Sequence, residues 1–124
     1  MVEINNLTSE KIDSKRVESV ILATLKKEGS NFDVSVAFVD PDEIKGINNK
    51  YRKIDRATDV LSFEELSEII ICPKEVRKNG KSFEDELIKV LIHGTLHLLG
   101  YDHEKDNGEM LERQDQYFQL LKSN

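Results

Sequence analysis

All three histidines of this sequence lie in one segment of eleven residues, HGTLHLLGYDH, residues 93–103. His93 and His97 are four positions apart, so on a helix their imidazoles stand about 40° apart and one turn along the axis. Gly100 follows where a helix commonly ends, because glycine adopts a left-handed backbone without steric cost. After such a bend, His103 can return to the side of the first two rings. The segment therefore predicts three imidazoles that converge at the end of one helix.

Three converging imidazoles predict a metal site. Neutral imidazole is a good ligand for zinc, and three protein ligands with an open fourth position are typical of catalytic zinc, whereas structural zinc usually has four ligands. Cys72 is the only cysteine, so no cysteine pair can complete a structural site. A single histidine is more often an ordinary core or surface residue, but three at ligand spacing favour metal binding. We expect one zinc ion per chain, although such sites also accept nickel, manganese or iron. The expected ligands are His93, His97 and His103.

The spacing HxxxHxxGxxH is also that of the metzincin peptidases, in which a glutamate that acts as general base follows the first histidine. Here Gly94 stands in its place, so a metallopeptidase stays an alternative without its usual base. A zinc centre can hydrolyse a phosphodiester without a strong protein base, because the ion lowers the pKa of water to about 7 and polarises a phosphoryl oxygen. Asp102 and Glu104 could orient an imidazole or move a proton.

Hydrophobic periodicity along the chain predicts an α+β fold, in which a small mixed four-stranded sheet packs against helices. The metal site would lie at the end of a central helix over residues 83–99, which Ser82 and Asp85 begin as a capping box. The other predicted elements are helices at 14–27, 42–50 and 106–121, and strands at 2–6, 33–40, 59–63 and 68–72.

Length and composition are those of a globular protein with one domain, residues 1–124. The chain has 38% hydrophobic and 34% charged residues, which argues against a disordered or fibrous protein. Neither a signal peptide nor a membrane-spanning stretch is visible, and the apolar neighbours of Cys72 favour a buried, inert thiol. These features predict a cytoplasmic protein with no membrane partner.

The charges of the chain are unevenly distributed. A net charge of −6 argues against a protein that binds nucleic acid without specificity over its whole surface. Residues 45–56 nevertheless carry five basic side chains against one acid, Asp55; the basic residues are Lys45, Lys50, Arg52, Lys53 and Arg56. A polyanion could therefore bind one basic face.

Two motifs together resemble those of a known family. The histidine segment and the upstream segment NNKYRKIDRATDVLSF, residues 48–63, are similar to those of the YbeY family of bacterial metal-dependent endoribonucleases and ribosomal RNA maturation factors. The resemblance covers most of the chain and implies a zincin-like fold. It also implies that Arg52 is the functional arginine of the family's YR element, and that the metal ligands are His93, His97 and His103.

The sequence departs from the family pattern next to these motifs. Ala57 and Glu64 stand where relatives often have proline, and Ser67-Glu68-Ile69 stands where they often have GDI. These changes affect turns and strand ends, so we expect a different loop shape around the cleft and an intact set of ligands.

The resemblance implies cleavage of single-stranded RNA, in maturation of the 3′ end of small-subunit ribosomal RNA and in ribosome quality control. The implied partners are this RNA and the ribosome or a small-subunit protein, and DNA is not specifically implied. We expect Arg52 to be catalytic, because a cation opposite the metal stabilises charge on the non-bridging oxygens. The candidates for binding substrate phosphates are Lys50, Arg52, Lys53 and Arg56. Attack by water or by the 2′-hydroxyl stays open, as does a non-catalytic assembly protein whose metal stiffens the turn after Gly100.

Overall fold

Four strands form one mixed sheet in the order β1-β2-β4-β3, in a computed structural model that describes residues 1–122. The strands β1 (Val2–Asn6), β2 (Val34–Phe38) and β4 (Glu68–Ile71) run parallel. The edge strand β3 (Val60–Phe63) pairs antiparallel with β4. The predicted mixed four-stranded sheet is confirmed, including the strand near the start of the chain.

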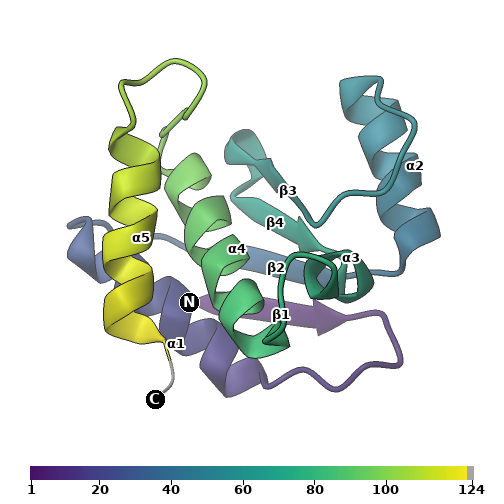
Figure 1. The fold of residues 1–124 in the computed structure, drawn as a ribbon, viewed down its shortest axis with the longest axis horizontal. Coiled ribbons are helices and arrows are strands. Elements are labelled where there is room, and N and C mark those ends of the chain that lie inside the picture. The colour runs from purple at the N-terminus through teal and green to yellow at the C-terminus, as the bar shows by residue number, and fades with distance from the viewer. Residues whose placement is uncertain (123–124) are drawn as a thin grey trace.

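Helices cover both faces of this sheet. They are α1 (Ser14–Lys27), α2 (Pro41–Arg52), the 3-10 helix η1 (Glu64–Leu66), α3 (Pro73–Arg77), α4 (Phe83–Leu98) and α5 (Glu109–Leu121). The helices α1, α4 and α5 gather on one face, and α2 stands apart from them on the other (Figure 1). Within residues 1–122, no helix is both long and apolar enough to cross a membrane.

Alternating apolar residues explain these layers, because successive side chains of a strand point to opposite faces of the sheet. In β2, Val36 and Phe38 are buried in the larger core, which the sheet forms with α1, α4 and α5. Ile70 of β4 belongs to a smaller cluster on the other face, together with Ile44 of α2. Cys72 lies in this smaller cluster, and burial raises the pKa of its thiol, as expected for an unreactive cysteine.

The central helix, α4, begins and ends at the predicted signals. The hydroxyl of Ser82 accepts a hydrogen bond from the Asp85 amide at 3.2 Å. At the other end, Gly100 has a φ of 97°, and its amide donates to the His97 carbonyl at 3.0 Å. The Tyr101 amide also bonds back into the last turn of α4. The chain therefore reverses at Gly100, three residues after the second histidine.

Three elements differ from the prediction, and one of them is the 3-10 helix η1, which was not predicted. The last helix, α5, begins at Glu109 and not at residue 106, because the Asp106 carboxylate accepts from the amides of Gly108 at 2.8 Å and Met110 at 3.0 Å. Residues 106–108 therefore form a cap that precedes the helix. The short helix α3 was not predicted, since Pro73 was expected only to end β4. Proline also suits the first turn of a helix, where its missing N–H needs no partner.

Candidate metal centre

The structure brings the rings of the three histidines together at the end of α4. Their centroids lie 4.6 Å apart for His93 and His97, 5.6 Å for His93 and His103, and 5.7 Å for His97 and His103. One nitrogen from each ring can be chosen so that all three lie within 4.8 Å of one another. His93 and His97 are half-buried and His103 is exposed on the turn, so the third ring has room to rotate toward the other two.

Hydrogen bonds donated by Nδ1 fix the tautomer of the two helical rings. Nδ1 of His97 donates to the backbone carbonyl of Tyr101 at 2.9 Å, and Nδ1 of His93 donates to Oε1 of Gln114 at 2.7 Å. A neutral imidazole carries one proton, so Nε2 of each ring carries a lone pair. Metal-binding histidines usually show this arrangement, in which the second nitrogen donates to an oxygen.

The donor set fits a zinc ion or a related metal. Nε2 of His93 and Nε2 of His97 face each other at 3.1 Å, where two lone pairs repel unless a cation lies between them. Two nitrogens bound to one tetrahedral zinc ion, each about 2.1 Å from it, would lie about 3.4 Å apart, close to this spacing. With His103 as the third ligand, one position of a tetrahedral ion would stay open for water or substrate.

Burial keeps the two helical rings neutral. Desolvation lowers the pKa of His93 below 6.5, although the hydrogen bond with Gln114 acts in the opposite direction. Desolvation also lowers the pKa of His97, and the neighbouring His93 adds to the effect. Metal ions bind the unprotonated ring, so both histidines are available as ligands at neutral pH.

Gly94 fits a narrow space between α4 and the sheet. A Cβ atom at this position would lie 3.1 Å from Cγ2 of Ile69 and 3.3 Å from Oγ of Ser62. The glutamate that metzincins carry here would therefore require the sheet or its side chains to move. This close packing gives a physical reason for the missing base, and it does not favour the peptidase alternative.

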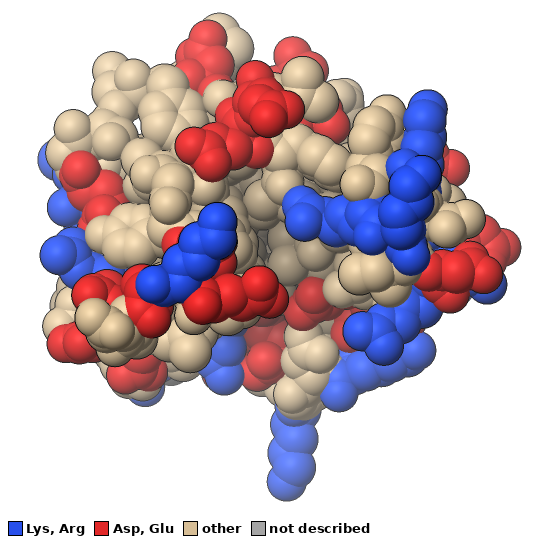
Figure 2. Space-filling view, turned by 90° about the horizontal axis from the view of Figure 1, so that it is seen from above, with Lys and Arg blue, Asp and Glu red and all other residues tan. Residues whose placement is uncertain are grey.

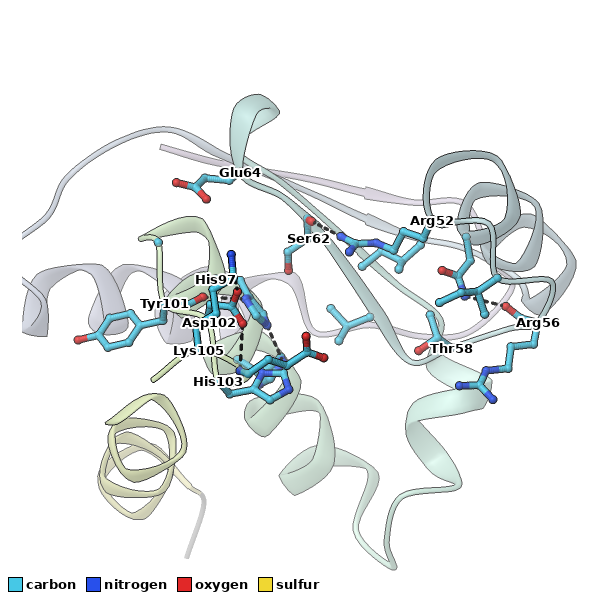
Figure 3. A pocket seen from close by; sticks show the side chains of 17 residues that line it. Arg52, Arg56, Thr58, Ser62, Glu64, His97, Tyr101, Asp102, His103 and Lys105 are labelled. Atoms are coloured by element: carbon cyan, nitrogen blue, oxygen red, sulfur yellow. Dashed lines mark hydrogen bonds and ion pairs between the residues drawn. The ribbon is translucent and has the colours of Figure 1, made fainter. Parts of the chain in front are cut away.

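The rings open into a cleft of about 620 Å³ between the end of α4 and the edge of the sheet. Figure 2 shows the hollow from above, with basic side chains gathered on one side of it and mostly acidic side chains, with a basic one among them, around the rest. In Figure 3, Arg52 and Arg56 lie across the cleft from the histidines. Asp102 and Glu104 line the histidine side. An anionic chain in this cleft would therefore be drawn toward the arginine wall.

Arg52 is held at the rim of the cleft by two contacts. One guanidinium nitrogen, Nη2, donates to the backbone carbonyl of Ser62 at 2.8 Å, and the guanidinium carbon lies 5.6 Å from the centroid of the Phe63 ring. A guanidinium has five N–H donors, so this arrangement leaves donors that can bind an anion in the cleft.

The other basic residues that were predicted to bind substrate lie in different places. Arg56 lines the cleft with Arg52. Lys50 and Lys53 are not among the residues that line it within the described chain. The ammonium of Lys50 lies 5.2 Å from the centroid of the Tyr51 ring, and Lys53 ends α2 with a φ of 62°.

Sequence analysis missed the two groups that orient the rings. Within residues 1–122, neither Asp102 nor Glu104 has a hydrogen bond to a histidine; the Asp102 carboxylate instead accepts from the Glu104 amide at 3.0 Å, which shapes the turn. The orienting groups are the carbonyl of Tyr101 and the side chain of Gln114. A backbone carbonyl leaves no signal in a sequence, and Gln114 lies on a different helix outside both motifs.

Comparison with known proteins decides the family. The model of the family described as Endoribonuclease YbeY matches residues 3–122. This chain belongs to the YbeY family. It is 38% identical over 125 residues to the Endoribonuclease YbeY of Sulfurimonas denitrificans, with 92% of this chain and 86% of the relative covered. It is 44% identical over 126 residues to the Endoribonuclease YbeY of Thermotoga neapolitana, with 93% of this chain and 78% of the relative covered.

A solved structure supports the fold of this YbeY-family chain. The solution structure of TM1509 from Thermotoga maritima matches it with a TM-score of 0.68 and 39% identity, and the match covers 98% of this chain and 89% of that one. The predicted family and the α+β fold class are both confirmed. The enzyme class expected from the sequence, an endoribonuclease, is also the class that the family's name states.

Proposed function

We propose that this YbeY-family protein is a zinc-dependent endoribonuclease that cleaves single-stranded RNA beside His93, His97 and His103. One observation carries the proposal: Arg52 and the three imidazoles line the same cleft. A ligand set for a metal ion and a facing cation suit a phosphodiester, because negative charge gathers on its non-bridging oxygens in the transition state. Nickel or another divalent transition metal would suit the same ligands.

The residues of the cleft would divide the work of binding and orienting the substrate. When bound, zinc supplies a Lewis acid that makes water a nucleophile near neutral pH and polarises a phosphoryl oxygen. Arg52 binds the non-bridging oxygens of the scissile phosphate, and Arg56 binds a flanking phosphate on the same wall. Asp102 and Glu104 repel the RNA backbone from the opposite wall, so the strand follows the arginines.

We further propose that the RNA is ribosomal. The similarity of both motifs to the YbeY family supports a role in maturing the 3′ end of small-subunit ribosomal RNA and in ribosome quality control, in the cytoplasm and with the ribosome or a small-subunit protein as partner. Lys50 precedes Arg52 and Lys53 follows it, and neither lines the cleft within the described residues. Both would contact RNA that extends beyond the cleft.

The test incubates zinc-loaded protein and its His97→Ala variant with a labelled single-stranded RNA and with unfolded casein. We expect the wild type to cleave the RNA and leave casein intact, and the variant to lose both zinc and RNA cleavage. Casein cleavage would support a peptidase, and silence on both substrates would support a non-catalytic role; either result contradicts the proposal. Cleavage that persists in the variant reveals a contaminating ribonuclease.

A further inference from the structure

The carboxylate of Glu28 accepts three hydrogen bonds beside the candidate metal centre. Glu28 directly follows α1, and its side chain is 9% exposed. Oε1 accepts from the Tyr101 hydroxyl at 2.7 Å, and Oε2 accepts from Nη1 of Arg113 at 2.8 Å and from the Tyr117 hydroxyl. Burial raises the pKa of this carboxyl, but the hydrogen bonds from both tyrosines and the charge of Arg113 outweigh it and leave the pKa below 4.5. The group is thus a charged carboxylate with matched donors.

Tyr101 links this carboxylate to one of the metal-binding rings. Its hydroxyl bonds to Glu28, and its backbone carbonyl accepts from Nδ1 of His97 at 2.9 Å. The residue lies in the bend directly after Gly100, beyond the end of α4. Because the carbonyl moves with its residue, the bond to Glu28 restrains the acceptor that sets the orientation and tautomer of His97.

The same carboxylate also restrains the helix that orients a second ring. Arg113 and Tyr117 are four residues apart on α5, and both donate to Glu28. Gln114 directly follows Arg113, and its Oε1 accepts from Nδ1 of His93 at 2.7 Å. A shift of α5 along or about its axis would break this bond. Glu28 therefore restrains the acceptors of both helical rings from outside the cleft.

We propose that Glu28 is a positioning residue for the metal centre: through Tyr101 and α5 it holds His97 and His93 with their Nε2 lone pairs toward the ion. This inference rests on the proposed metal-dependent function. In the alternative, Glu28 only stabilises the packing of α1 against α5 and has no effect on the histidine rings. That alternative predicts lower stability with no change of tautomer, and with the same zinc affinity as a control variant of similar stability.

The experiment compares Glu28→Gln and Tyr101→Phe with Val17→Ala, which shortens a fully buried side chain of α1 that has no group able to hydrogen-bond to Glu28. Long-range ¹H–¹⁵N NMR of the metal-free protein shows whether the proton of His97 is on Nδ1 or on Nε2. Competition with a chromophoric chelator gives the zinc affinity. Urea unfolding with a chelator present gives the stability of each metal-free variant.

We expect the Nδ1–H tautomer of His97 in the wild type and in Val17→Ala, and a larger Nε2–H fraction in Glu28→Gln and Tyr101→Phe. Zinc affinity should fall about tenfold in Glu28→Gln and less in Tyr101→Phe, while Val17→Ala stays within about twofold of the wild type. The effects of the two network variants should not add when combined, because both act on the same contact.

Two results would overturn different claims. An unchanged His97 tautomer and unchanged zinc affinity in Glu28→Gln would overturn the positioning role, and so would an equal loss of zinc affinity in Val17→Ala. A wild-type protein that binds no zinc would overturn the proposed metal centre. In that case the tautomer of His97 in the metal-free variants still decides whether Glu28 positions the ring.

Discussion

Gln114 of α5 accepts a hydrogen bond from Nδ1 of His93 at 2.7 Å, although the two residues are 21 positions apart in the chain. The bond joins the last helix to the central helix at the metal centre. The packing of α5 therefore affects the orientation of a candidate ligand, His93, and α5 is itself held by the buried side chains of Met110 and Phe118. We expect substitutions on this helix to change metal binding even though they lie outside the histidine motif.

Gln114→Ala should lower zinc affinity by about tenfold, because the His93 ring loses the acceptor that fixes its tautomer. Gln114→Glu should retain wild-type affinity, since a carboxylate also accepts from the ring. Chelator competition at neutral pH measures both variants. Gln116→Ala, an exposed position on the same helix, serves as the control and should bind zinc like the wild type. Equal affinities in Gln114→Ala and Gln116→Ala would contradict the role of Gln114.

Arg52→Ala should lower the rate of RNA cleavage by about a hundredfold, the loss typical of removing one group that stabilises transition-state charge. Zinc content and unfolding midpoint should stay near wild type, because the Arg52 side chain is on the rim and not among the candidate metal ligands. Single-turnover cleavage of a labelled RNA gives the rate. Lys26→Ala removes one exposed positive charge from α1 and controls for net charge. Near-normal turnover in Arg52→Ala would remove Arg52 from the mechanism.

Gly94→Ala should destabilise the metal-free protein by about 1–3 kcal/mol, because the added Cβ is forced against Ile69 in a closely packed interface. Gly46→Ala provides a matched control within α2, where an added Cβ has no neighbour within 4 Å. That variant should gain about 0.5–1 kcal/mol from the better helix propensity of alanine. Urea unfolding with a chelator present measures both. The packing argument fails if the two substitutions change stability in the same direction.

The stability of the metal-free protein should depend on the ionisation of Glu28 at acid pH. The pKa of Glu28 in the folded chain lies below its ordinary value of 4.5, so the unfolded chain binds the proton more tightly. The stabilisation from this carboxylate is therefore complete above about pH 4.5 and is lost as the pH falls through the folded pKa. Urea unfolding from neutral pH down to about pH 3 should show the wild type converging on Glu28→Gln. Parallel curves for the two proteins would show that Glu28 does not contribute this pH dependence.

Features of the site that depend on residues close together in the chain could be predicted from the sequence, and features that depend on residues far apart could not. The spacing of His93 and His97 on one helix face depends on helix geometry alone. Ser82 and Gly100 mark the ends of that helix by local hydrogen bonds and backbone conformation, and both signals operate in the structure. The start of α5 was placed wrongly because the side chain of Asp106 caps the helix from before its first turn.

The sequence by itself determined the helix that carries His93 and His97, the mixed sheet and the family, and it predicted the candidate ligand set, because these depend on periodicity, turn residues and motif spacing within short segments. Only the tertiary structure decided which groups orient the ligands and which basic residues face them. The bonds of Glu28 to Tyr101, Arg113 and Tyr117 span 73, 85 and 89 positions. Such contacts form only when separate helices dock on the sheet, and no local pattern in the chain encodes how their side chains will meet.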